Sequence, residues 1–121
     1  MKKYEFVERD TIEHNGVTLK RIRAINDFGG VFAGDLGGYI EGEKNLAHEG
    51  NAWVSGDAWV YGNARVYGNA QVYGNARVYG NAWVSGDAQV SGNAEVYGNA
   101  QVYGNAQVYG NAWVYGNALV S

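Results

Sequence analysis

The 121-residue sequence contains no cysteine, two histidines and no long apolar run. Without cysteine there is neither a disulfide framework nor a thiolate metal site, and two histidines cannot build a His-rich zinc centre, so we predict no metal and no cofactor. Nine Lys and Arg against twelve Asp and Glu leave a formal charge of -3, which gives no electrostatic basis for general nucleic-acid binding. The chain also lacks a signal-peptide core and a membrane span, and we therefore expect a cytoplasmic protein with no membrane partner.

A hexapeptide repeat occupies the chain from residue 50 onward. Residues 50–121 read as twelve consecutive units of the type Gly-Asn-Ala-x-Val-Tyr, without an insertion. A unit this short cannot bury its own apolar face and can do so only by stacking on its neighbours. Disorder is the alternative, but the repeat is too apolar for it. We predict an all-β solenoid, a parallel β-helix, over 50–121.

Alternation within each unit separates an inner from an outer side. Ala64 and Val66 are two residues apart and therefore point to the same side of an extended strand, which we take as the interior. Arg65 and Tyr67 then point outward. Gly followed by Asn or Asp allows a sharp corner every six residues. The product is a prism of short parallel strands.

The number of faces follows from which outward side chains would stack. With two faces, Arg65 would lie directly over Arg77, a like-charge contact that is unfavourable. With three faces, Arg77 lies between Trp59 and Glu95 and gains a cation–π neighbour and an opposite charge. We therefore predict a triangular prism of about four coils. The same spacing places four tyrosines in one column: Tyr61, Tyr79, Tyr97 and Tyr115.

Residues 1–49 carry most of the charge and do not follow the repeat. Asn15-Gly16 stands between β-forming residues and predicts a two-residue hairpin turn. Ile40 and Leu46 are six residues apart and in step with the first alanine of the repeats, so we expect them in inward positions of a degenerate first coil. We predict that the hairpin caps the N-terminal end of the solenoid.

The repeat runs without interruption to Ser121, so we expect the last coil to be uncapped. An uncapped coil leaves backbone groups and apolar side chains for another chain to cover. We predict self-association there, as a dimer, with a trimer as the alternative. The residues expected at this end are Trp113, Tyr115, Leu119 and Val120.

The Ala-x-Val-x-Gly-Asn unit resembles the hexapeptide repeat of left-handed parallel β-helix proteins, which include many trimeric acyltransferases. The segment from Arg21 to Val54 resembles the region that precedes the repeats in a poorly characterised subgroup. Members of this subgroup are found in bacterial and prophage genomes and are named transferases because of their repeat. The resemblance implies a left-handed coil. It also implies that a catalytic member would use a histidine as its general base, and His14 and His48 are the two candidates.

We interpret neither histidine as catalytic. His14 precedes the predicted turn and is expected to be solvated, while His48 belongs to the degenerate coil, and a base also needs a substrate pocket. The repeat array shows no loop excursion of the kind that the resembling enzymes have. A calcium site at Asp57 and Asp87 is not predicted, because these two carboxylates are isolated.

The outer surface offers a binding function instead. Aromatic and Arg clusters are typical of interface hot spots, although stacked tyrosines also stabilise a ladder on their own. We predict a non-catalytic scaffold that binds a protein partner or itself; one specific form is a phage-encoded inhibitor of a host defence protein. The alternatives are an acyltransferase or an inactive relative, and a structural component of a virion or filament. The predicted binding face consists of Trp59, Tyr61, Arg77, Tyr79, Glu95, Tyr97, Trp113 and Tyr115.

Overall fold

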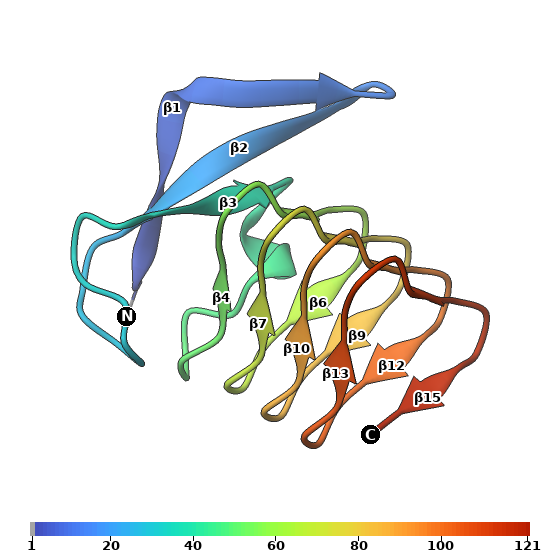
Figure 1. Ribbon diagram of the computed structural model, residues 1–121. Helices are drawn as coiled ribbons and strands as arrows, with labels where there is room; N and C mark the ends of the chain where they lie inside the picture. Colours follow the sequence, from blue (N-terminus) through green and yellow to red (C-terminus); the bar gives the residue numbers. More distant parts are fainter. Residues whose placement is uncertain (1) are drawn as a thin grey trace.

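The computed structural model describes residues 2–121 and shows a parallel β-solenoid with three faces (Figure 1). Face A is a sheet in the order β1 (Tyr4–His14), β2 (Val17–Ala24), β3 (Leu36–Ile40), β5 (Trp59–Val60), β8 (Arg77–Val78), β11 (Glu95–Val96) and β14 (Trp113–Val114). Face B holds β4 (Trp53–Val54), β7 (Gln71–Val72), β10 (Gln89–Val90) and β13 (Gln107–Val108). Face C holds β6 (Arg65–Val66), β9 (Trp83–Val84), β12 (Gln101–Val102) and β15 (Leu119–Val120). A short 3-10 turn, η1 (Glu43–Asn45), precedes the repeats.

The strand register confirms the three-faced prediction. Trp59 pairs with Arg77 and Arg77 pairs with Glu95 on face A, so stacked residues are 18 positions apart. The valines follow the same register, and Val60 pairs with Val78. Each coil therefore contributes one hexapeptide to each face.

The interior is formed by the alanines and valines that the sequence predicts to point inward. Ala76 and Val78 are fully buried, as are almost all alanines and valines of the repeats. Gly74 begins the corner before Ala76 with φ +68°, and a Cβ at this glycine would lie 3.0 Å from the backbone nitrogen of Gly92 in the next coil. Corners thus need glycine both for its positive φ and for the close approach of the coils.

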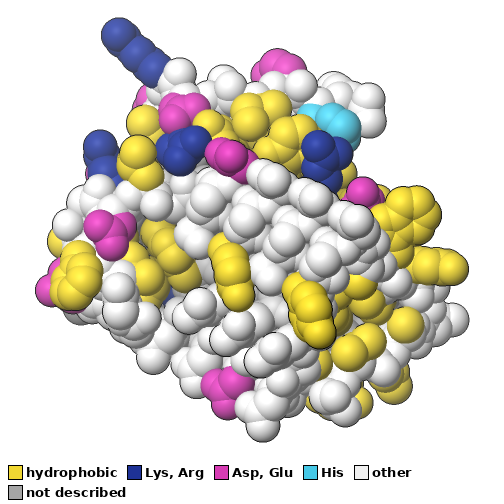
Figure 2. All heavy atoms as spheres, in the orientation of Figure 1, with side chains coloured by type: hydrophobic (Ala, Val, Ile, Leu, Met, Phe, Trp, Pro, Cys, Tyr) yellow, Lys and Arg dark blue, Asp and Glu magenta, His cyan; other side chains and the backbone are white. Residues whose placement is uncertain are grey.

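The predicted hairpin is present. β1 and β2 pair in antiparallel fashion, and the turn residues Asn15 and Gly16 both have positive φ, at 51° and 81°. This is the conformation for which an Asn-Gly pair is favoured. Figure 1 shows the hairpin reaching along the solenoid rather than standing away from it. Charged side chains gather around the hairpin, and few lie over the repeats (Figure 2).

The degenerate first coil differs in register from the prediction. Ile40 and Leu46 are fully buried, as expected. Ile40, however, pairs with Val60, and Leu46 bridges to Val66, so both occupy valine positions and not alanine positions. The cause is a longer corner after Leu46, where two further residues precede Gly50.

Asn45 closes the first coil on face C. It is fully buried, and its Nδ2 donates to the carbonyl oxygens of Gly62 at 3.2 Å and Ala64 at 2.9 Å. One coil further along, the carbonyl oxygen of Ala82 instead accepts a hydrogen bond from the backbone N–H of Arg65. A side-chain amide therefore replaces backbone donors that the irregular coil does not supply.

Lys3 has the same role at another corner. Its Nζ donates to the carbonyl oxygens of Gly50 at 3.3 Å and Ala52 at 2.6 Å. Lys3 is 4% exposed, and its ammonium group lies 4.7 Å from the centre of the Phe28 ring. Burial lowers the pKa of Lys3 to about 8.

Within residues 2–121 we find no helix with the length and apolarity that crossing a membrane requires. The left-handed coil that the family resemblance implies stays a prediction, as does the capping role of residues 1–49.

Replacing Lys3 with Met tests this capping role. We expect Lys3→Met to lower the free energy of unfolding by about 1–3 kcal/mol, because two buried carbonyl oxygens lose their donor. The unfolded chain keeps the Lys3 proton up to a pKa of 10.5, whereas the folded chain releases it near 8, so the unfolding free energy that Lys3 contributes rises as the pH rises through this interval.

Urea titrations of both proteins at several pH values between 7 and 10 measure this contribution. The exposed neighbour Lys2 supplies the control, since Lys2→Met should leave the stability almost unchanged. An equal stability of Lys3→Met and the unsubstituted protein at every pH would contradict the capping role.

Candidate binding face

Face A carries the predicted column of Trp59, Arg77, Glu95 and Trp113 in consecutive register. The Arg77 guanidinium lies over the Trp59 ring, 4.1 Å from its centre, which confirms the predicted cation–π contact. Both side chains are half-buried. The guanidinium is thereby held by a ring that precedes it in the chain.

The opposite-charge contact predicted for Arg77 takes a different form. Among the described residues, no ion pair joins Arg77 to Glu95. The Glu95 carboxylate accepts a hydrogen bond from the Tyr79 hydroxyl at 2.8 Å instead. Since the phenol reaches Glu95 from the adjacent column, it replaces the expected partner.

A continuous stack of tyrosines runs beside this column. The ring centres of Tyr61 and Tyr79 are 5.0 Å apart, as are those of Tyr79 and Tyr97, while Tyr97 and Tyr115 are 5.5 Å apart. The rings are nearly parallel, with interplanar angles of 7°, 4° and 13°. On faces B and C the same position alternates between Ser and Tyr, so face A alone has an unbroken stack.

Burial in the stack keeps the phenols protonated. Desolvation raises the pKa of Tyr61 and of Tyr79 above the ordinary value, and the hydrogen bond to Glu95 adds to the rise at Tyr79. The hydroxyl groups consequently remain hydrogen-bond donors at neutral and moderately alkaline pH.

The hairpin covers the N-terminal part of face A, around Trp59 and Tyr61. The His14 ring packs against Trp59 at 5.0 Å and Tyr61 at 5.8 Å between ring centres. His14, which was expected to be solvated, is half-buried, because the hairpin folds back onto the face. The Asn15-Gly16 pair predicts the position of the turn in the sequence, but nothing in the sequence indicates which surface the turn packs against.

A groove of about 500 Å³ lies below the hairpin. Ile12 and Tyr39 border it on the hairpin side, and Asp57, Asn75 and Asn93 border it along the corner. Its floor contains three members of the predicted face, Trp59, Arg77 and Glu95. Sequence reasoning missed Ile12 and Tyr39, because they reach the groove only through the packing of β1 and β3.

His48 belongs to the N-terminal structure and not to this groove. Its ring stacks on Tyr4, with centres 4.0 Å apart. Nδ1 accepts the backbone N–H of Lys3 at 3.1 Å, so Nε2 carries the proton that is donated to Glu43 at 2.7 Å. This hydrogen bond is the main reason why the pKa of Glu43 is lowered. Both ring nitrogens are thus engaged, which leaves neither to accept a substrate proton.

The residues predicted for self-association lie on two faces of the last coil. Trp113 and Tyr115 belong to face A and are 64% and 56% exposed, while Leu119 on face C is 65% exposed and Val120 is half-buried. Their role in self-association stays a prediction.

Two comparisons relate the chain to known proteins. The model of one family, described as YdcK beta solenoid repeat, matches residues 58–71, 70–86, 88–104, 100–115 and 106–121, which is over half of the chain. A protein of Escherichia coli (strain K12) named "Uncharacterized acetyltransferase YdcK" is 41% identical over 61 residues. This similarity covers 45% of the present chain and 19% of the E. coli protein.

Removing one ring from the stack should measure what stacking contributes. Tyr79→Ser abolishes two stacked pairs and is expected to lower the free energy of unfolding by about 1–3 kcal/mol more than Tyr73→Ser does. Tyr73 is a matched control, because its hydroxyl also donates to a side chain in the next coil, Gln89, while its ring has no stacked tyrosine. Serine is native to this position in four units.

Urea denaturation followed by circular dichroism gives both values. Equal losses for Tyr79→Ser and Tyr73→Ser would show that the stack adds nothing to stability.

Proposed function

The chain belongs to the YdcK β-solenoid repeat family, and we propose that it is a non-catalytic scaffold that binds a partner protein through face A. The proposed surface is the aromatic face, made of Trp59, Tyr61, Arg77, Tyr79, Glu95, Tyr97, Trp113 and Tyr115. The observation that carries the proposal is the unbroken tyrosine stack beside the Trp59–Arg77 contact.

Stacking prepares these side chains for recognition. Tyr, Trp and Arg dominate the energetically important parts of interfaces because they offer large contact areas with few rotatable bonds. Here Tyr79 is held by rings on both sides, and Arg77 is held by Trp59. Less conformational entropy is lost when such side chains bind than when free ones do.

Successive positions of the column on face A carry opposite charges. Arg77 and Glu95 follow one another on β8 and β11, with aromatic residues at Trp59 and Trp113 before and after them. A fitting partner presents a carboxylate opposite Arg77 and a cation or hydrogen-bond donor opposite Glu95. The partner is either another protein or a second copy of this chain, with a dimer favoured over a trimer. A phage-encoded inhibitor of a host defence protein is one specific form of this role.

Substitution of two stacked tyrosines tests the proposal. The double variant Tyr79→Ser with Tyr97→Ser should weaken partner capture at least about tenfold, because central aromatic side chains dominate binding. The matched control is Tyr73→Ser with Tyr109→Ser, which removes two rings from face B and should change nothing. Quantitative mass spectrometry of proteins retained from bacterial lysate, together with sedimentation of the purified chain for self-association, provides the readout.

Equal retention of every captured protein by the two double variants would contradict a role for face A. Thermal unfolding of both variants verifies that each remains folded, so that lost capture is not confused with lost structure.

A second candidate function is acetyl transfer, which is favoured by the name of the E. coli relative. On the scaffold proposal we expect no turnover of acetyl-CoA by the purified chain with amine or hydroxyl acceptors. His14→Ala and His48→Ala are the diagnostic variants, since these two residues are the histidines of the sequence. Turnover that either substitution abolishes would replace the scaffold proposal with an enzymatic one.

A further inference from the structure

Face C contains the same pair of residue types as face A in the reverse order. On face A the arginine follows the tryptophan, and Arg77 covers the Trp59 ring. On face C Arg65 precedes its register partner Trp83, and within residues 2–121 no cation–π contact joins the two. Trp83 is consequently 41% exposed. Reversal of the order leaves an indole ring uncovered.

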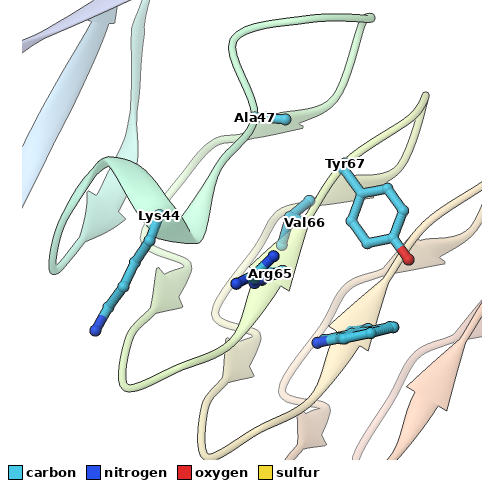
Figure 3. A pocket seen from close by; sticks show the side chains of 6 residues that line it. Lys44, Ala47, Arg65, Val66 and Tyr67 are labelled. Carbon is cyan, nitrogen blue, oxygen red and sulfur yellow. The ribbon is translucent and has the colours of Figure 1, made fainter.

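The uncovered ring borders a pocket of about 240 Å³. Tyr67 stands almost perpendicular to Trp83, with ring centres 6.3 Å apart and an angle of 77°, so the two rings form a corner. Figure 3 shows Arg65 beside Val66 on β6, with Lys44 on one side and Tyr67 on the other. Ala47 from the degenerate coil completes the lining.

The pocket is positively charged although the whole protein has a formal charge of -3. Lys44 and Arg65 both line it, and none of the six described lining residues is acidic. The neighbouring carboxylate of Glu43 is directed elsewhere, since it binds His48 and Lys2. Lys44 is placed at the corner by a hydrogen bond from its Nζ to Asn63 Oδ1 at 3.3 Å. Arg65 therefore borders the open aromatic corner, and the Lys44 ammonium group lies on the far side of Arg65 from Tyr67 (Figure 3).

We infer that this pocket binds a small phosphate monoester that carries a single ring. The ring stacks on Trp83 against the edge formed by Tyr67, and the phosphate accepts hydrogen bonds from Arg65 and from Lys44, whose flexible side chain turns from Asn63 to reach it. A dianionic phosphate suits a pair of cations better than a neutral group does. The volume of about 240 Å³ is smaller than the roughly 300–1,000 Å³ of ordinary ligand sites, which limits the ligand to one ring with one anionic group.

NMR titration of the purified chain with defined probes tests this site. Phenyl phosphate and glucose 6-phosphate distinguish an aromatic ring from a sugar ring, inorganic phosphate lacks the ring, and phenol lacks the charge. We expect one of the two ring phosphates, phenyl phosphate or glucose 6-phosphate, to bind saturably with a dissociation constant on the order of 1 mM. It should shift the indole N–H signal of Trp83, which is assigned by its loss in Trp83→Gln. Inorganic phosphate and phenol should each bind at least about tenfold more weakly.

Variants then locate the site. Arg65→Gln and Trp83→Gln should each weaken binding of the ring phosphate at least about tenfold, followed through the phosphorus signal of the ligand. Gln already occupies this position of the unit at 71, 89, 101 and 107, so the fold should tolerate both changes. Arg77→Gln is the matched control on face A and should bind like the unsubstituted chain.

Three results would overturn the inference: no saturable binding of either ring phosphate, equal binding of inorganic phosphate, or equal weakening by Arg77→Gln and Arg65→Gln. Because the aromatic face plays no part in this measurement, failure of the pocket and failure of the proposed scaffold role are distinguishable.

Discussion

The 18-residue register between coils is the constraint on which the rest of this molecule depends. Alanine and valine are small enough for three short strands to enclose a dry interior, and a glycine corner such as Gly74 allows the next coil to pass closely. Once these contacts are fixed, each outward side chain has one neighbour above and one below. The chemistry of each face is therefore determined by which residues stand 18 apart.

Register explains why three faces built from one repeat differ. Tyrosine recurs without interruption only on face A, where it forms the stack that includes Tyr61 and Tyr79. The order of unlike residues matters as well, because Arg77 covers Trp59 whereas Arg65 leaves Trp83 open. Small changes in a repetitive sequence thus produce a flat aromatic surface on one side and a charged pocket on another.

The repeats made most of the fold and part of the site predictable. Periodicity gives the inward residues and the column that contains Trp59, Arg77 and Glu95, since these depend only on spacing. Residues 1–49 have no such periodicity, so the resting place of His14, the two-residue shift at Leu46 and the donor role of Lys3 follow from packing between distant segments. The bond from Tyr79 to Glu95 escaped prediction because it joins different columns of adjacent coils, whereas the spacing relates only residues of one column, 18 apart.

Disulfide formation between introduced cysteines measures the register most directly, because the chain has no cysteine of its own. Neighbouring strands lie within the Cα separation that a disulfide permits. We predict that Tyr67→Cys with Ser85→Cys, 18 residues apart on face C, oxidises readily to an intramolecular disulfide, whereas Tyr73→Cys with Ser85→Cys, 12 apart on different faces, does not. Ready oxidation of the second pair with a reduced first pair would contradict the three-faced register and every surface derived from it.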